Sequence, residues 1–146
     1  MLLVEFGNRS DAVRPQEFVL VEHLFQNPAE SLERDRAIAL LADDSGALSI
    51  QVLQEFYVQA TRTSRADAIS HELAAGLIEA WSRFRIQDMT FPILQTALRI
   101  RKAHRFSFWD SAIVAAALAL GCDRVYTEDL NHGQTVDGIA IVDPFR

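Results

Sequence analysis

The chain has 146 residues and a net charge of −6, and 49% of its residues are hydrophobic. This composition is ordinary for a globular protein, and no apolar run approaches the ~20 residues that cross a bilayer, so we expect a cytoplasmic protein without a membrane partner. The single cysteine, Cys122, excludes an internal disulfide and a thiolate zinc site, and the negative charge excludes a nucleic-acid binder that works by net charge alone.

The first part of the chain gives the least regular pattern. No repeat or linker divides the sequence, so we predict one domain over residues 1–146, in which residues 1–15 have no sustained periodicity and form an atypical N-terminus. The apolar segment Phe18–Phe25 fits a strand or a short helix, and Leu32–Ala42 has the apolar spacing of a helix. A short apolar run after Asp-Ser-Gly, Ala47–Ile50, is consistent with a buried strand.

From this point on, apolar segments with helical spacing alternate with short strand-like runs. Ser49 and Ser107 are suited to cap the helices that follow them, and Gly121 is suited to end the second of these helices. We predict helices over Gln51–Thr61, Ala66–Trp81, Ile93–His104 and from Ser107 to Leu120, and strands over Phe84–Ile86, Arg124–Tyr126 and Gly138–Val142.

This alternation predicts the fold class. Short strands between helices indicate an α/β fold with a central parallel sheet of about four to five strands, flanked by helices on both faces. In such sheets, functional residues gather where the strands end, at their carboxyl edge. Side chains just beyond the strands are therefore the first candidates for a site.

Three acidic residues lie just beyond a strand or inside an apolar helix. Glu55 lies early in the helix after the first clear strand, Asp110 lies in the first turn of the most apolar helix, and Asp129 directly follows a strand. A carboxylate in apolar surroundings is costly unless a donor or cation compensates it, and carboxylates that share one concavity repel until a divalent ion neutralises them. Oxygen ligands of this kind select hard cations such as Mg2+ or Mn2+.

Each acid also has a purely structural interpretation. Asp110 follows Ser107 by three residues, so the pair fits a helix capping box. Glu55 fits an exposed helix position, and Asp129 fits the cap of a turn. A different α/β hydrolase or phosphatase is a further alternative, although the chain lacks a Gly-x-Ser-x-Gly elbow, a phosphate-binding glycine loop and an Asp-x-Asp pair.

The motifs around these acids resemble those of one family. In order, Gln-Val-Leu-Gln-Glu-Phe-Tyr, Phe-Trp-Asp-Ser-Ala-Ile-Val-Ala-Ala-Ala and Thr-Glu-Asp-Leu-Asn-His-Gly look like the three later acidic motifs of PIN-domain ribonucleases of the VapC toxin type. Gly-Cys-Asp-Arg-Val-Tyr and Ile-Val-Asp-Pro-Phe are also similar to that family. The resemblance covers most of the chain, from Asn27 to Phe145, and it implies a PIN-like fold.

The resemblance also implies an activity. VapC-type proteins are Mg2+- or Mn2+-dependent endoribonucleases that cleave RNA phosphodiesters with a metal-activated water, and a VapB-type antitoxin restrains them. By this resemblance Glu55, Asp110 and Asp129 are catalytic, metal-binding acids, and Thr127 adds a hydroxyl beside them. We also expect a homodimer, with Phe56, Tyr57, Ile93 and Leu94 as candidates for its apolar surface.

The chain departs from the family pattern at the N-terminus. The family begins with a strand that ends in an aspartate, usually within Asp-Thr-Asn, and this motif is missing here. Glu17 and Glu5 are the candidate substitutes for that first acid, with Glu22 as a third. Either such a glutamate restores the site, or the chain is a degenerate, impaired PIN domain that binds RNA or an antitoxin.

Two further features bear on RNA binding. Arg99, Lys102 and Arg105, with Arg101 among them, form a basic cluster before the Asp110 motif that could hold the RNA backbone, or could simply be a solvated helix face. Trp109 could stack on a base, but its place in an apolar helix favours a core position.

Overall fold

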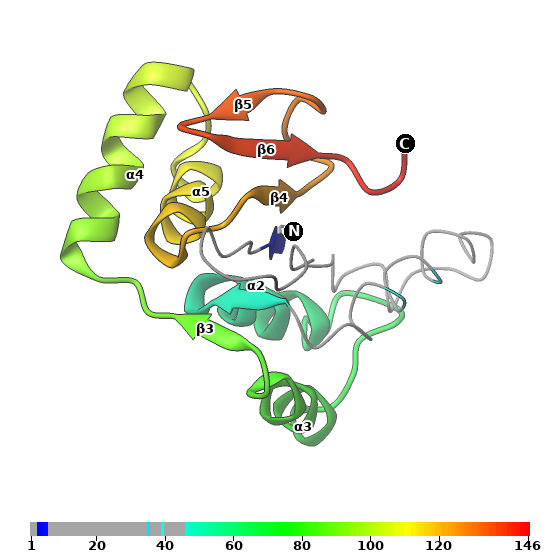
Figure 1. Ribbon diagram of the computed structural model, residues 1–146. Helices are drawn as coiled ribbons and strands as arrows, with labels where there is room; N and C mark the ends of the chain where they lie inside the picture. Colours follow the sequence, from blue (N-terminus) through cyan, green and yellow to red (C-terminus); the bar gives the residue numbers. More distant parts are fainter. Residues whose placement is uncertain (1–2, 6–34, 36–38, 40–45) are drawn as a thin grey trace.

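The computed structural model describes residues 3–5, 35, 39 and 46–146 (Figure 1). The segment Phe18–Phe25 lies outside the described residues, and of the predicted helix Leu32–Ala42 only Asp35 and Ala39 are described, both as helical. The elements, in chain order, are β1 (Leu3–Glu5), β2 (Ala47–Ser49), α2 (Ile50–Ala60), α3 (His71–Trp81), β3 (Arg85–Gln87), α4 (Phe91–His104), α5 (Phe108–Leu120), β4 (Arg124–Tyr126), β5 (Thr135–Val136) and β6 (Ile139–Val142).

The described strands form one sheet of six strands in the order β3-β2-β1-β4-β6-β5. The pairs β2–β3 and β4–β6 are parallel: α2 and α3 form the crossover from β2 to β3, whereas the connection from β4 to β6 contains the strand β5 and no helix. The α/β fold class is confirmed, but the sheet is mixed rather than wholly parallel. β1 is antiparallel to both β2 and β4, and β5 is antiparallel to β6.

Strand β5 belongs to a tight hairpin that the sequence analysis did not predict. Val136 pairs with Ile139, so only Asp137 and Gly138 lie in the turn, and their φ angles are 50° and 91°. Two consecutive positive φ angles are those of a type I′ turn, for which Asp-Gly is a preferred sequence. The strand was overlooked because it has only two residues, Thr135 and Val136.

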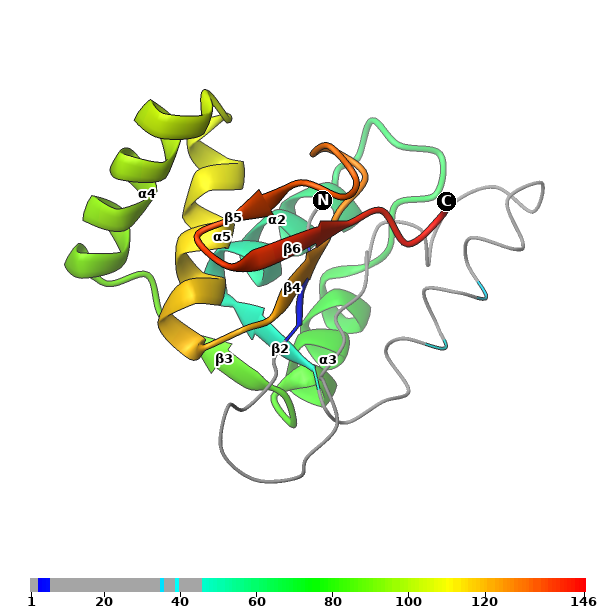
Figure 2. The ribbon, with the colours of Figure 1, turned by 45° about the horizontal axis from the view of Figure 1, so that its top comes forward.

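The helix that lies deepest in the molecule is α5. Every residue from Ser111 to Ala117 is buried, and the helix contacts β1, β3, β4 and β6 of the sheet. Helix α4 lies alongside α5 in both ribbon views (Figures 1 and 2), and the small side chains of α5 permit close packing. Gly121 ends the helix in the left-handed conformation, at φ 76°, as predicted.

Two helix boundaries differ from the predictions for local reasons. Helix α3 begins at His71 rather than Ala66, because Ser70 caps it by accepting a hydrogen bond from the Leu73 N–H at 3.2 Å. Helix α4 begins two residues early, at Phe91, because Pro92 fits the first turn of a helix. Neither change moves a predicted site residue out of its element.

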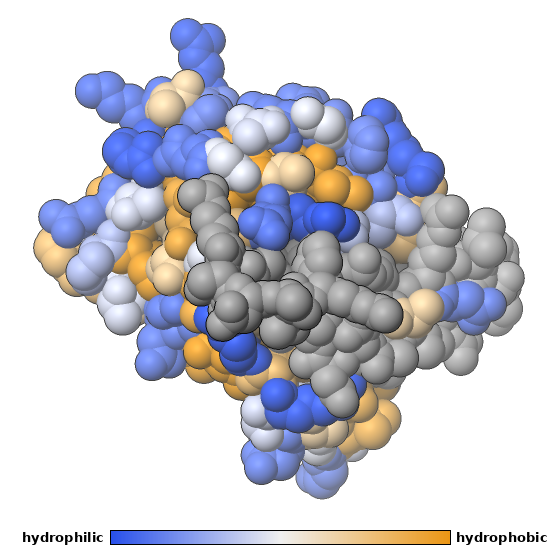
Figure 3. All heavy atoms as spheres, in the orientation of Figure 1, coloured by the Kyte–Doolittle hydropathy of each residue, from blue (hydrophilic) through white to orange (hydrophobic). Residues whose placement is uncertain are grey.

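The core includes two residues that the sequence analysis assigned to an apolar self-association surface. Phe56 is 1% exposed and Ile93 is 5% exposed, so both pack inside the protein and that assignment is wrong for them. In the space-filling view, hydrophilic residues cover much of the rim near α4 and β5 (Figure 3). None of the described helices is long and apolar enough to span a membrane.

Candidate functional site

Glu55 is positioned by a short link between a strand and a helix. Ser49 is the last residue of β2 and also the N-cap of α2, where its Oγ accepts a hydrogen bond from the Val52 N–H at 3.2 Å. The helix therefore starts directly at the carboxyl end of β2. One and a half turns later it presents Glu55, which is partly exposed.

Gln51 connects Glu55 to the start of α5. This side chain is 4% exposed, and its Nε2 donates to Glu55 Oε1 at 2.8 Å and to the Trp109 carbonyl oxygen at 3.3 Å. One amide nitrogen thus joins the carboxylate on α2 to the residue that precedes Asp110. Among the described residues, Gln51 Oε1 has no hydrogen-bond partner although it is buried.

The sequence analysis did not identify Gln51 as a site residue. A signal was present, because a glutamine four residues before Glu55 faces the same side of a helix. The neighbouring Val52 and Leu53 are core residues, which places Gln51 on the inner part of the helix surface. A buried amide beside a carboxylate indicates a positioning role.

Ser107 caps the helix that carries Asp110 and also binds the Asp110 side chain, which confirms the serine half of the expected capping box. The Asp110 backbone N–H donates to Ser107 Oγ at 3.0 Å, and Ser107 Oγ–H donates to Asp110 Oδ2 at 2.5 Å. This arrangement fixes the carboxylate at the N-terminus of α5, where the helix dipole favours negative charge. It engages one carboxylate oxygen and leaves the other available for a ligand.

Thr127 and Asp129 follow β4 and are held by its last hydrogen bonds. Thr127 is fully buried, and its N–H donates to the Val142 carbonyl at 2.9 Å. Its Oγ1 accepts from the Asp129 N–H at 3.0 Å, which confirms a turn immediately after the strand. The Asp129 side chain is exposed at the carboxyl end of β4, the edge at which α2 begins after β2.

The three predicted acids do not form a ready-made cluster. Within residues 46–146 and the other described positions, no group of three or more His, Cys, Asp or Glu residues could hold a metal ion. What the structure does bring together is Glu55 and the first turn of α5, through Gln51. The donors themselves are all oxygen, which fits a hard divalent cation.

Of the three candidates for the missing first acid, Glu17 and Glu22 lie outside the described residues, and of Glu5 the backbone is described. In the β1–β4 register Glu5 pairs with Arg124, the first residue of β4, whereas Leu3 pairs with Tyr126, the last. Because β1 runs antiparallel to β4, the Glu5 backbone lies at the opposite edge of the sheet from Asp129. This placement does not favour Glu5 as the substitute.

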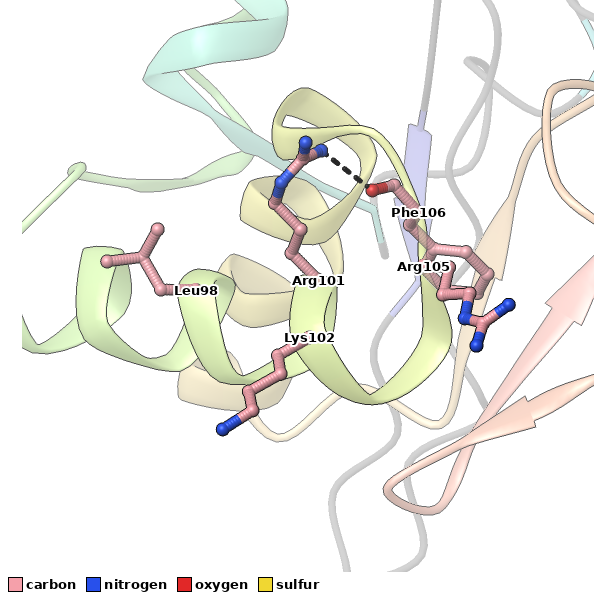
Figure 4. A pocket seen from close by; sticks show the side chains of 5 residues that line it. All are labelled: Leu98, Arg101, Lys102, Arg105 and Phe106. Atoms are coloured by element: carbon pink, nitrogen blue, oxygen red, sulfur yellow. Dashed lines mark hydrogen bonds between the residues drawn. The ribbon is translucent and has the colours of Figure 1, made fainter.

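The basic cluster does not converge on one point. Arg99 forms an ion pair with Asp137 at 2.5 Å. Arg101, Lys102 and Arg105 line a hollow of about 430 Å³ together with Leu98 and Phe106, and Arg101 Nη1 donates to the Phe106 carbonyl at 3.0 Å. Figure 4 shows the ends of these three cationic side chains pointing in different directions. They supply positive charge to this surface rather than a pocket for a single phosphate.

Trp109 is not in the core. Its side chain is 60% exposed, although it lies in the first turn of the most buried helix. The expectation of a core position is wrong because the inward face of α5 begins only at Ser111.

Comparison with known proteins gives the family. The model of the PIN domain matches residues 19–137, most of the chain, and this range contains Glu55, Asp110 and Asp129. The match begins after Glu5 and Glu17. No significant match was found among curated proteins. The matched range and the α/β fold lead to one conclusion: the chain belongs to the PIN domain family.

Proposed function

We propose that the chain is a Mg2+- or Mn2+-dependent endoribonuclease, the toxin of a VapBC-type toxin–antitoxin pair. PIN domains are nuclease-type domains, which gives the reaction class. The observation that carries the proposal is the Gln51 bridge, which ties Glu55 to the residue before Asp110. A part-buried hydrogen-bond link between the Glu55 carboxylate and the backbone directly before Asp110, two distant parts of the chain, supports a site here rather than a solvated surface.

In this proposal Glu55, Asp110 and Asp129 hold the ion, and Thr127 orients the turn that carries Asp129. A bound divalent ion supplies charge neutralisation at the phosphodiester and activation of water.

The proposed partners follow from the motif resemblance to VapC-type toxins. They are an RNA substrate, a VapB-type antitoxin and a second copy of the chain in a homodimer. A short antitoxin-like reading frame directly upstream of the coding sequence would support the toxin assignment. Light scattering of the pure protein measures the oligomeric state.

The first test is RNA cleavage by the purified protein. We predict cleavage with added Mg2+ or Mn2+, none in EDTA, and at least a hundredfold slower cleavage by Asp110→Asn, because the variant loses a carboxylate that holds the ion. Asp123→Asn is the matched control, since Asp123 is exposed at the amino end of β4 and should leave the rate unchanged. Cleavage that persists in EDTA would refute the mechanism.

A second candidate function is a degenerate PIN domain that binds RNA or an antitoxin without cutting. Two observations favour it: the missing Asp-Thr-Asn motif, and the lack of a metal-binding group of three acids among the described residues. A protein that binds RNA but does not cleave it at any Mn2+ concentration would support this alternative over the nuclease.

A further inference from the structure

The exposure of Trp109 has no explanation in the stability of the fold. A tryptophan contributes to folding chiefly by burying its large apolar surface, and this indole is 60% exposed while residues Ser111 to Ala117 behind it are buried. The other tryptophan, Trp81, behaves as expected, with 4% exposure and an edge contact to Phe56. Trp109 therefore presents an exposed aromatic surface at the start of α5.

Two contacts hold Trp109 in place, one through its backbone and one through its ring. The Trp109 carbonyl accepts the hydrogen bond from the buried Gln51 amide at 3.3 Å, so the backbone is anchored to α2. The ring also meets Phe108 edge to face, with centroids 5.2 Å apart and planes at 71°. An aromatic platform that is already ordered loses little conformational entropy when a flat ligand stacks on it.

The position of this platform indicates its ligand. Trp109 is the residue directly before Asp110 in the first turn of α5, so the two side chains start from adjacent backbone positions and lie about 100° apart around the helix. Arg101, Lys102 and Arg105, which line a hollow at the end of α4, precede Trp109 closely in the chain. Aromatic side chains flanked by cations are the usual means of holding unstacked bases in single-stranded RNA.

We infer that Trp109 is a stacking subsite for one nucleobase of single-stranded RNA, next to the phosphodiester that Asp110 serves. The inference rests on the proposed nuclease function and adds to it the form of the substrate. It selects loops and single strands, whose bases can turn outward, over continuous duplex. Because any base has a flat face, stacking here holds the chain in register without specifying the base.

The test uses the two tryptophans as reporters. A short single-stranded RNA is titrated in EDTA, where the proposed reaction cannot proceed, while tryptophan fluorescence and binding are followed. We expect the RNA to quench the wild-type emission, and Trp109→Ala, which retains only the buried Trp81, to lose the quenching and to bind about tenfold or more weakly. Trp109→Phe should restore most of the affinity, because phenylalanine also stacks.

Three further measurements complete the design. An abasic oligomer of the same length keeps the phosphates but lacks the bases. The wild type should bind it less tightly than it binds the unmodified RNA, whereas Trp109→Ala should bind the two oligomers with equal affinity. Duplex RNA should quench the tryptophan fluorescence of the wild type only slightly. Trp109→Ala should unfold at the wild-type temperature, because the side chain is exposed.

Two outcomes would overturn the inference: equal RNA affinity of the wild type and Trp109→Ala, or RNA that binds without quenching, which would assign the indole to a protein partner. Quenching in EDTA without any cleavage in Mn2+ would refute the nuclease and leave the RNA subsite standing.

Discussion

The Gln51 side chain makes two hydrogen bonds that connect Glu55 on α2 to the start of α5. Its Nε2 holds the Glu55 carboxylate at 2.8 Å and the Trp109 carbonyl at 3.3 Å, which fixes the spacing between α2 and the start of α5. Its Oε1 remains buried without a partner among the described residues. A buried oxygen without a partner costs stability, so the Gln51 amide contributes less to the fold than a fully hydrogen-bonded side chain would.

Replacement of Gln51 by methionine tests this positioning role. Gln51→Met keeps the length of the side chain but removes both hydrogen bonds, and loss of a residue that orients a metal ligand typically lowers affinity about tenfold to a hundredfold. We expect that loss in Mn2+ affinity, measured from the electron paramagnetic resonance of free Mn2+. The free energy of unfolding should change by about 1 kcal/mol or less, because the buried oxygen without a partner is removed as well.

Gln54→Met is the matched control, since it makes the same substitution at an exposed position of the same helix. It should leave Mn2+ affinity unchanged. Equal affinities of Gln51→Met and the wild type would mean that Gln51 only joins the two helices.

At the scale of single elements, two serine caps place the two acids. Ser49 starts α2 directly at the end of β2, and Ser107 starts α5 while also donating to Asp110 Oδ2. Both serines were predicted as caps from the sequence, because capping depends on neighbouring residues alone. The tertiary link between the two helix starts could not be predicted, since Gln51 and Trp109 are far apart in the chain.

The caps of α5 and α3 offer a matched pair of substitutions. Ser107→Ala and Ser70→Ala each remove a side-chain oxygen that accepts a helix N–H, at 3.0 Å and 3.2 Å, and each should lower the free energy of unfolding by about 1 kcal/mol. Only Ser107 also holds a predicted site acid. Ser107→Ala should therefore raise the Mn2+ concentration needed for half-maximal RNA cleavage by about tenfold, and Ser70→Ala should not.

Chemical denaturation measures the first effect and a Mn2+ titration of the cleavage rate measures the second. If the two variants require the same Mn2+ concentration, Ser107 is a helix cap and nothing more.

For the whole molecule, the α/β class followed from the alternation of strands and helices, and the parallel pairs β2–β3 and β4–β6 bear this out. The direction of β1 could not be predicted from the sequence. Leu3–Glu5 has only three residues, and the sequence around it has no sustained periodicity that would indicate how the strand pairs. Its antiparallel register with β4 places Glu5 at the edge away from Asp129. A strand's pairing depends on contacts across the sheet, which a pattern within one segment does not contain.

The residues of the candidate site could be predicted from the sequence, but their arrangement in space could not. Glu55, Asp110 and Asp129 are predicted as site residues from their positions beyond a strand or inside an apolar helix and from their motifs, and the range matched by the family model includes all three. Their distances from one another depend on side-chain rotamers and on the charge that each carries. The exposure of Trp109 likewise depends on which face of α5 turns inward, and the apolar residues around it gave the opposite expectation.

The measurement that tests the central claim most directly is Mn2+ calorimetry on the pure protein. If Glu55 and the start of α5 form one side of a metal site, the wild type should bind Mn2+ with micromolar affinity, and Asp110→Asn should bind at least tenfold more weakly. Millimolar binding or none by the wild type would contradict the metal-site account and favour the degenerate binding module.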